Sequence, residues 1–379
     1  MNNTKVGGGV RSTLMIEALS KLGHVDVISF VKEPVESSIP NCNVVFCGET
    51  PKIELTLGDK ALHYGRSIFT PWRPDAHYYV DQEQAKTVSR YYDAKHYDFV
   101  VCHFIEDAVM CGLLRYADRL IIDVDDNLIS VAKRSQANTS HESMLERFKR
   151  MWRTRTVGKM QRQLLERVRL SFYSNEHEPP YEKSIFLHNV PFLSCPCDDM
   201  TEHTPMRLLF VGKVDFAPNK NGLSHFLEAV FPIIQKRMPE VELNVVGWCQ
   251  DEDFRLKLSS TPGVHVVGFV EDLREAYQNC SVVIVPIYYG AGTSIKFIEG
   301  IMMNRPVVAT PMGARGFDRS FEANRHYCLA NSDQEFADQV VYLLSDRARA
   351  GIMAREACEI AKAHFSKESF FEVVKTSLS

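Results

Sequence analysis

The sequence predicts an α/β fold built from parallel sheets. Short runs rich in Val and Ile alternate along the chain with stretches of helical period, and this alternation is typical of parallel strands joined by crossover helices. With 379 residues, of which 45% are hydrophobic and 24% charged, the chain has the composition of a globular protein. It is long enough for about two domains with separate cores. We therefore expect two α/β domains, each with its own sheet.

Both halves of the chain contain candidate strands separated by helical stretches. In the first half the strands are expected at residues 24–31, 43–48, 98–104, 119–125 and 170–174, with a helix at 12–23. In the second half they are expected at 206–212, 241–247, 264–270, 281–287 and 305–310, with helices at 222–237, 251–259, 272–278 and 294–303. A proline-containing polar stretch without periodicity, residues 188–205, separates the halves. We place the domains at 1–195 and 196–379, and we allow that the last helix packs back on the first domain.

Targeting and redox features favour the cytoplasm. No apolar run reaches the ~18 residues that a membrane helix needs, and the N-terminus lacks the apolar stretch of a signal peptide. The ten cysteines include no Cys-x-x-Cys pair, so we expect reduced thiols. Cys195 and Cys197 have no partners at zinc spacing, and no metal site is expected. No strand is followed by G-x-G-x-x-G, which disfavours a dinucleotide oxidoreductase.

The net charge of −4 is unevenly distributed. Residues 133–169 contain eleven Lys or Arg and three Glu, so this segment carries about +8. Its apolar residues recur every three or four positions, which predicts a helix with one apolar face. These residues are Met144, Phe148, Met151, Trp152, Val157, Met160, Leu164 and Val168. The basic face is either solvated or meets an anionic partner: a membrane surface, a lipid-linked phosphate or an acidic glycan. No nucleic-acid motif accompanies the charge, so nucleic acid is not an expected partner.

Loops after the strands of the second half are the expected binding site, because ligands of open parallel sheets bind at the carboxyl ends of the strands. The small residues in YYGAGTSIKFIEG, residues 288–300, let the backbone of this loop come close to an anion at the N-terminus of the following helix. Its small and hydroxyl residues are Gly290, Ala291, Gly292, Thr293 and Ser294. Lys296 in the first helical turn opposes the helix dipole unless something negative is present. Glu299 either hydrogen-bonds a ribose diol or is a solvent-facing helix residue.

Residues 206–318 resemble the nucleotide-sugar half of the GT-B glycosyltransferases, in the large retaining group called group 1 or family 4. The resemblance rests on the order and spacing of FVGKVDFAPNKNG, ELNVVG, GVHVVGFVEDLREAYQNCSVVIVP, GAGTSIKFIEGIMMNRPVVAT and GARGF. It implies a GT-B fold, with two Rossmann-like domains facing each other across a cleft. It also implies a UDP-sugar or GDP-sugar as donor substrate, with no other cofactor.

The resemblance also assigns roles to residues. Lys213 and Lys220 stand where the family has a basic pair on the donor diphosphate, beside the backbone of 290–294. Glu299 matches the second glutamate of the E-x7-E motif, which bonds the ribose. The first glutamate is replaced by Ala291, as in a subgroup with a GGGT-like loop. The remaining expected donor contacts are Gly8, Gly9, Gly212, Gly247, Phe269, Val270 and Lys296, with Gly268 beside the base.

The first half resembles the family less closely. The glycines at 7–9 are similar to the loop that faces the diphosphate and the acceptor. In IIDVDDN, Asp125 takes the place of the family's strand-end His, with Asp126 beside it. His103, with Glu106, is another polar pair at a strand end. These residues are either loop caps or catalytic groups.

The expected activity is sugar transfer to a glycan or lipid-linked acceptor with retention of anomeric configuration, in surface polysaccharide or glycoconjugate synthesis. The candidate catalytic residues are Asp125, Asp126, His103, Lys213 and Lys220. Lysines and a helix dipole would neutralise the leaving diphosphate without a metal. The protein would be cytoplasmic, with the basic segment at the inner face of a membrane. Two alternatives stay open: a nucleotide-sugar 2-epimerase, and a catalytically silent subunit that binds a partner enzyme through the basic helix.

Overall fold

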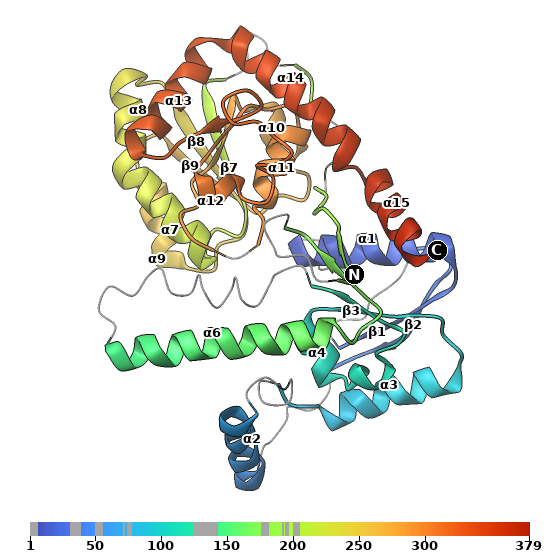
Figure 1. Cartoon of the computed structure of the whole chain (residues 1–379). Coiled ribbons are helices and arrows are strands. Elements are labelled where there is room, and N and C mark those ends of the chain that lie inside the picture. Colours follow the sequence, from blue (N-terminus) through green and yellow to red (C-terminus); the bar gives the residue numbers. More distant parts are fainter. Residues whose placement is uncertain are drawn as a thin grey trace. The chain divides into compact units, whose positions relative to one another are not determined.

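A computed structural model gives the fold of the chain (Figure 1). It describes residues 7–30, 39–49, 56–70, 73, 78–124, 143–175, 182–191, 193, 197–199, 205–290 and 292–379. Contacts divide the chain into two units: a first unit of Met1–His188 with Phe371–Ser379, and a second unit of Asn189–Phe370. The division follows residue 188, a few residues before the position near 195 that the linker composition suggests. The predicted α/β class is confirmed, since each unit contains a parallel sheet.

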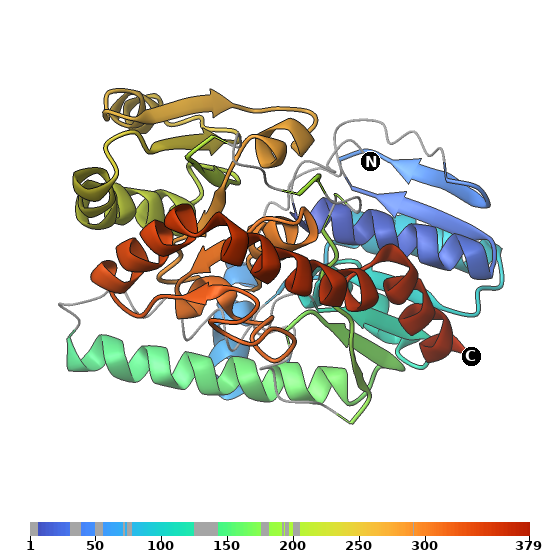
Figure 2. The ribbon, with the colours of Figure 1, turned by 90° about the horizontal axis from the view of Figure 1, so that it is seen from above.

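The first unit contains two parallel sheets. In the four-stranded sheet the order is β3 (Val100–His103), β4 (Leu120–Asp123), β5 (Leu170–Tyr173) and β6 (Ser184–Phe186). In the other, β1 (Val25–Ser29) pairs with β2 (Cys42–Cys47), and α1 (Gly7–Leu22) lies beside them (Figure 2). The five strands predicted for this half are confirmed. The three residues of β6 are too few to show an alternating pattern.

Helices of the first unit vary in how they are capped and buried. They are α1, α2 (Leu57–Phe69), α3 (Gln82–Ala94), α4 (Ile105–Met110), the 3₁₀ turn η2 (Leu113–Tyr116) and α6 (Met144–Leu165). Thr56 and Asp59 form a capping box at the start of α2, and the Asp81 side chain caps α3. From the C-terminus, α15 (Lys367–Leu378) contributes Phe371, whose ring lies 3.7 Å from Nζ of Lys21.

The predicted helix in the basic segment is confirmed as α6, but the prediction of one apolar face is wrong. Met160 and Leu164, in its second half, are buried in the core of the first unit. Met144 and Phe148, in its first half, are exposed. The buried and exposed apolar residues belong to different sides of the helix, and a count of apolar residues alone does not distinguish the sides.

A six-stranded parallel sheet forms the second unit. Its order is β12 (Cys328–Leu329), β11 (Val307–Ala309), β10 (Val282–Val285), β7 (Arg207–Val211), β8 (Glu242–Val246) and β9 (Val264–Gly268). All five strands predicted for this half are confirmed. Successive residues of a strand point to opposite faces. Leu208 and Phe210 accordingly enter one core cluster while Leu209 and Val211 enter another, so the sheet is buried on both sides.

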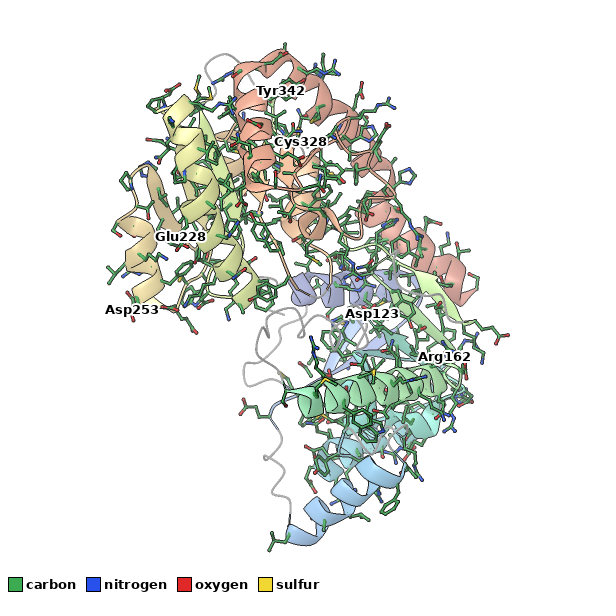
Figure 3. The ribbon with its side chains drawn as sticks, turned by 60° about the vertical axis from the view of Figure 1, so that its left-hand side comes forward. Asp123, Arg162, Glu228, Asp253, Cys328 and Tyr342 are labelled. Atoms are coloured by element: carbon green, nitrogen blue, oxygen red, sulfur yellow. The ribbon has the colours of Figure 1, made fainter. Side chains whose placement is uncertain are left out.

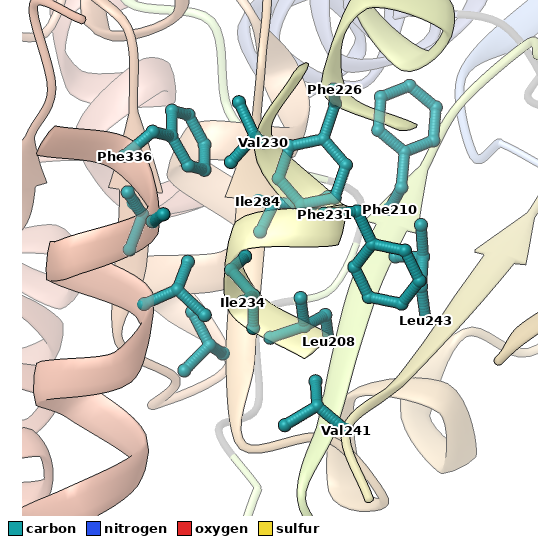
Figure 4. Packing of buried hydrophobic residues seen from close by; sticks show 14 of the residues in the cluster. Leu208, Phe210, Phe226, Val230, Phe231, Ile234, Val241, Leu243, Ile284 and Phe336 are labelled. Carbon is teal, nitrogen blue, oxygen red and sulfur yellow. The ribbon is translucent and has the colours of Figure 1, made fainter. Parts of the chain in front are cut away.

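Helices cover both faces of this sheet. They are α7 (Ala217–His225), the π turn η3 (Phe226–Val230), α8 (Phe231–Arg237), α9 (Glu252–Ser259), α10 (Arg274–Gln278), α11 (Ile295–Met302), α12 (Pro311–Ala314), α13 (Asp333–Ser345) and α14 (Arg347–His364). Figure 4 shows Phe226 with Phe336 and Phe231 on either side of it, in the core cluster that also contains Phe210 of β7. Pro232 lacks the N–H that an α-helix needs at this position, which accounts for the π turn before it.

The strand order creates a switch point between β10 and β7. From β7 the chain runs outward through β8 to β9, and then returns to β10 before continuing to β11 and β12. Crossover helices therefore diverge on either side of this pair, and the carboxyl ends of β7 and β10 border a crevice. The loops after these two strands begin at Gly212 and Pro286.

Candidate functional site

Two glycines bring the ends of β7 and β8 into close backbone contact. Gly212 has φ +148° and Gly247 has φ +140°, in a region that L side chains rarely adopt. A Cβ on Gly247 would lie 1.8 Å from the carbonyl oxygen of Gly212. Both positions therefore require glycine. The expected donor contacts at Gly212 and Gly247 lie at the ends of β7 and β8, and the side chains of Asn219 and Lys296 lie against Gly212.

A third glycine seats α7 against the loop after β10. A Cβ on Gly222 would lie 2.0 Å from the carbonyl oxygen of Pro286. Further along the loop, Gly290 (φ +149°) lies against Pro218, with 3.5 Å from its Cβ position to Cγ of the proline. The start of α7 and the small-residue loop therefore pack together, and both follow strands of the switch point.

Lys296 lies beside the end of β7, held by Asn219. Its Nζ donates to Oδ1 of Asn219 over 3.0 Å. The amide nitrogen of Asn219, which is buried, donates to the carbonyl oxygen of Lys213 over 2.7 Å. The Lys296 ammonium also lies 5.1 Å from the centre of the Phe210 ring. Contacts from α7 and β7 therefore position the Lys296 ammonium at the switch point.

The charge of Lys296 lacks an ion-pair partner in the described part of the chain. Burial lowers the pKa of Lys296 to about 8, against an opposing effect of Glu299 one turn later. Lys296 stands in the first turn of α11, where the helix dipole also disfavours a cation. An anion at this position would relieve both effects, so the environment favours a ligand with negative charge.

The two lysines of the expected basic pair lie in different surroundings. Lys213 is half exposed, and its Nζ lies 3.9 Å from Asp215. Lys220 forms an ion pair with Asp251, whose hydrogen bond raises the pKa of the lysine. Asp251 also caps α9 by accepting from the N–H of Phe254. The ammonium of Lys220 is therefore held by a carboxylate, whereas the ammonium of Lys296 is held by a neutral amide.

The small-residue loop ends at the start of α11. Gly292 has φ +70°, and Ser294 occupies the N-cap position without a side-chain hydrogen bond to the helix. Thr293 instead accepts from the side-chain amide of Asn189 over 2.9 Å. Ala291 lies outside the described residues. The first turn of α11 is therefore left without a side-chain cap, and Asn189 fixes the preceding residue.

Glu299 is buried rather than solvent-facing. It is 7% exposed, and the Tyr277 hydroxyl donates to its Oε2 over 3.2 Å. Tyr277 is fully buried, and burial together with the charge of Glu299 raises the pKa of its hydroxyl. A carboxylate directed by a buried hydroxyl suits the recognition of a diol better than a solvated helix residue does.

The segment expected beside the nucleotide base, residues 268–270, follows β9 at the edge of the sheet. Gly268 has φ +82°, Phe269 is partly exposed and Val270 packs against a core cluster. Beyond Gly247, the Trp248 side chain is exposed. The strand ends after β8 and β9 therefore each present an aromatic ring.

In the first unit, His103 and Asp123 meet at the ends of β3 and β4. Nδ1 of His103 lies 3.1 Å from Oδ2 of Asp123. An ionised carboxylate only accepts hydrogen bonds, so Nδ1 of His103 carries the proton of this contact. Nε2 is buried and has no hydrogen-bond partner among the described residues. Figure 3 labels Asp123 in this unit.

Arg11 of α1 fixes the Asp123 carboxylate. Its Nε and Nη2 donate to Asp123 over 2.7 to 2.9 Å, and Nη1 donates to the carbonyl oxygen of Leu187 over 3.0 Å. Both side chains are 2% exposed. Burial on its own would raise the pKa of Asp123, but Arg11 and the His103 hydrogen bond outweigh it and lower the pKa to about 2. The carboxylate therefore stays ionised as it orients His103.

The turn after His103 has an uncommon backbone conformation. Phe104 has φ +68° and ψ +146°, a region that is rare for a residue with a large side chain. It precedes α4, whose first turn contains Glu106, and its ring centre lies 4.0 Å from that of His103. Strain of this kind persists only where surrounding contacts fix the turn.

The other expected residues of the first unit are less informative. Gly8 and Gly9 lie in the first turn of α1 rather than in a loop before it, and the carbonyl oxygen of Gly9 accepts from Thr13 over 2.9 Å. Asp125 and Asp126 lie outside the described residues. Within the described ranges, no group of three His, Cys, Asp or Glu is placed to hold a metal ion.

Sequence patterns missed several residues of the site. They are Arg11, Asp123, Asn189, Asn219, Asp251 and Tyr277. Each contacts another residue of the site that is distant in sequence, by 22 positions for Tyr277 and Glu299 and by 112 for Arg11 and Asp123. A signal was present only for Asn219, an amide directly before Lys220 in PNKNG. The others become visible only when the strand ends are brought together.

Sequence comparison relates part of the chain to glycosyltransferases. Residues 205–346 match the family model of group 1 glycosyl transferases. The chain is 24% identical over 182 residues to an uncharacterized 44.6 kDa protein in the cps region of Klebsiella pneumoniae. It is 26% identical over 179 residues to a phosphatidyl-myo-inositol mannosyltransferase of Mycolicibacterium smegmatis. Each match covers 46% of this chain and of the relative, so the chain spans about half the length of the curated relatives it matches.

Solved structures show the fold. A sucrose-phosphate synthase of Thermosynechococcus elongatus superposes with a TM-score of 0.68 at 16% identity, covering 97% of this chain and 91% of that one. The Anabaena protein Alr3699/HepE, in complex with UDP and glucose, gives 0.61 at 13% identity, covering 97% and 95%. The chain thus has the fold of the GT-B glycosyltransferases, and its second unit contains a segment that matches their group 1 family model.

Proposed function

We propose that the protein is a glycosyltransferase that uses a nucleoside-diphosphate sugar as donor, UDP-linked or GDP-linked. The observation that carries this proposal is Lys296 at the switch point of the second unit, a half-buried ammonium that has no carboxylate partner among the described residues. The group 1 family match to residues 205–346 supports it, as does UDP in the Anabaena structure.

Donor binding follows from the residues at the strand ends. The diphosphate lies by the uncapped first turn of α11, near Lys296, with Lys213 and Lys220 as further cations. Glu299, directed by Tyr277, accepts from the ribose hydroxyls. The base lies beside Phe269 and Val270, after β9.

The reaction is transfer with retention and without a metal. The bond between the anomeric carbon and the diphosphate oxygen breaks, and a bond to the acceptor oxygen forms on the same face of the sugar. The acceptor proton passes to the leaving phosphate, so a nucleoside diphosphate departs. The lysines and the helix dipole stabilise the charge that develops on that phosphate.

Residues of the first unit hold the sugar or the acceptor. His103, which Asp123 orients through Nδ1, is a candidate for this contact, because its Nε2 has no hydrogen-bond partner among the described residues. Asp125 and Asp126 are candidates for the same task. The acceptor is a glycan or a lipid-linked sugar, in surface polysaccharide or glycoconjugate synthesis, and the protein acts in the cytoplasm at the inner face of a membrane.

Thermal unfolding with UDP, GDP and ADP tests the proposal, with Glu299→Ala beside the wild type. A ligand at 100 times its Kd adds about 2.7 kcal/mol of stability. We expect one nucleotide to raise the midpoint in the wild type only. No shift with any nucleotide would contradict the proposal in favour of a silent binding subunit. Conversion of the donor sugar without acceptor would indicate a 2-epimerase.

The metal and the stereochemistry need separate measurements. Transfer from the donor identified in this way should persist in excess chelator, and NMR of the product should show the anomeric configuration of the donor. Lys220→Ala should abolish transfer with the fold intact. Undiminished turnover of that variant would remove Lys220 from the mechanism.

A further inference from the structure

One face of α6 is apolar along its first half and basic along its second. An α-helix turns by about 100° per residue, so residues three, four, seven or eight apart share a face. The residues that share this face are Met144, Phe148, Met151, Trp152, Arg155, Lys159 and Arg162. They lie within an arc of about 100°. We call these residues the α6 stripe.

The α6 stripe is exposed along its whole length. Met144 is 82% exposed and Trp152, the least exposed of its apolar members, is 41% exposed. Arg155, Lys159 and Arg162 are exposed as well. Figure 3 shows α6 with Arg162 labelled. Four large apolar side chains in one row are more than the scattered exposed hydrophobic residues that an ordinary surface contains.

The core of the first unit lies on the other side of the helix. Met160, Gln161, Leu164 and Leu165 are buried and share a second arc. At about 100° per residue, the centre of that arc lies roughly 160° from the centre of the α6 stripe. Continuation of the core along α6 would therefore not cover Met144 or Phe148.

We infer that the α6 stripe docks on a bilayer that contains anionic lipids. Apolar side chains in a row enter the boundary between headgroups and acyl chains, where Trp is favoured, and basic residues on the same face pair with lipid phosphates. All three charges of the stripe are positive, in a segment that carries eleven Lys or Arg against three Glu. The helix lies in the membrane plane, because no described helix is long and apolar enough to cross one.

The chemistry of the α6 stripe favours an anionic bilayer over two other partners, a second copy of the chain and a nucleic acid. A second copy of the same stripe would place basic residues against basic residues in a parallel pairing, and a nucleic acid has no use for the four apolar side chains. This inference rests on the proposed placement at a membrane and names the residues that achieve it. Lipid binding requires no sugar transfer, so it can fail or succeed independently of the nucleotide-binding test.

Vesicle flotation with the full chain tests the inference. We expect binding to vesicles of phosphatidylcholine with 30% phosphatidylglycerol at low salt, and much weaker binding to pure phosphatidylcholine. Neutralising Arg155, Lys159 and Arg162 to Gln should weaken binding roughly 100-fold, at about 1 kcal/mol per basic residue. Phe148→Ser with Trp152→Ser should weaken it at least about tenfold. These residues are exposed, so the thermal midpoint should not change.

Matched controls lie on the second unit. Leu256→Ser removes an exposed apolar residue of α9, and Arg237, Lys257 and Arg325 changed to Gln remove three exposed charges. Both should bind vesicles like the wild type. With Trp72 and Trp248 changed to Phe, Trp152 is the remaining tryptophan, and its emission should shift to the blue on anionic vesicles.

Three results would overturn the inference. They are absence of flotation with anionic vesicles, equal binding by wild type and stripe variants, and a dimer in light scattering that Phe148→Ser with Trp152→Ser dissolves. The last would assign the stripe to a second copy of the chain. RNA binding is a further outcome to check. If RNA bound in a salt-sensitive way, competed with vesicles and still bound the Phe148→Ser, Trp152→Ser variant, the basic residues would be assigned to nucleic acid.

Discussion

Asn219 and Lys296 lie side by side at the switch point, with the lysine ammonium donating to the amide oxygen over 3.0 Å. The amide nitrogen is occupied by the carbonyl oxygen of Lys213, so its oxygen faces the lysine. Lys296 is thereby held in place by a neutral partner. A carboxylate in the position of Asn219 would neutralise the lysine and repel a diphosphate, whereas an amide does neither.

The first prediction concerns pH and Lys296. Its pKa is lowered to about 8, so the ammonium is present below pH 8 and is lost as the pH rises above it. Because an anion favours the charged form, nucleotide binding should take up a proton near pH 8. UDP affinity should fall about fourfold from pH 7.0 to 8.5. Calorimetry in buffers of different ionisation enthalpy measures both quantities.

Two variants serve as controls for this experiment. The charged group that acts on Lys296 is Glu299, on its own helix, and it opposes the lowered pKa. Lys296→Met should bind UDP more weakly and lose the pH dependence. Asn219→Asp should also lose it, because a carboxylate raises the pKa of the lysine. An unchanged pH dependence in Lys296→Met would assign the titration to another group.

The second prediction concerns Glu299 and the ribose. A hydrogen bond to a charged group contributes about 1.5–3 kcal/mol, so Glu299→Gln should weaken UDP binding at least tenfold. The same change should have little effect on 2′-deoxy-UDP, which lacks one hydroxyl of the diol. Tyr277→Phe should give a smaller loss of the same kind. Equal losses for both nucleotides would show that Glu299 acts on the fold rather than on the ribose.

The third prediction concerns the buried pair of Arg11 and Asp123. Arg11→Ala removes the guanidinium partner of a buried carboxylate and should lower the free energy of unfolding by about 3–5 kcal/mol. Arg325→Ala, which removes two exposed ion pairs, should change it little. Urea denaturation compares the two variants, and similar behaviour would contradict the burial of Arg11.

The same pair predicts a loss of stability in acid. The pKa of Asp123 is about 2 in the folded chain, below its usual value near 4. Its contribution is therefore fully present above about pH 4 and is lost as the pH falls through 2. In Arg11→Ala this part of the pH dependence should be reduced or reversed, which acid titration of the thermal midpoint can detect.

The fourth prediction compares two helical glycines of the second unit. Gly222→Ala places a Cβ 2.0 Å from the carbonyl oxygen of Pro286, so α7 must move away from the small-residue loop. Stability and nucleotide affinity should both fall. At Gly351 of α14 the nearest atom to a Cβ is the flexible Arg355 side chain at 3.4 Å, and Gly351→Ala should stabilise by up to about 1 kcal/mol. A stable, nucleotide-binding Gly222→Ala variant would contradict the packing.

Local pattern was sufficient for most of the fold. All ten predicted strands are present, because parallel strands with helices on both faces are continuous Val and Ile runs that end at Gly or polar residues. The pattern was misleading in α6, whose apolar residues lie on two different faces of the helix. In α6, apolar residues recur at helical spacing, yet Met144 is exposed and Met160 is buried. Periodicity identifies a helix but does not show which side meets the core.

The candidate site divides in the same way. The loop residues Gly290 and Gly292 and the charged pair Lys296 and Glu299 could be proposed from spacing, because they follow one strand. Their partners Asn219 and Tyr277 could not, because they follow other strands and have no pattern of their own. Asp123 is a similar case: neighbouring Asp125 and Asp126 attracted attention by resemblance, while Asp123 holds His103.

The sequence by itself determined the α/β class, the strand positions, and the small-residue loop with its lysine and glutamate, since these depend on residues close together in the chain. Only the tertiary structure decided which charges are paired and which are available. Lys220 meets Asp251, Lys296 meets an amide, and Asp123 meets Arg11, all through side chains that distant strands and helices bring within hydrogen-bond distance. Burial then sets the pKa values, because loss of water acts on a side chain only after the chain has folded around it.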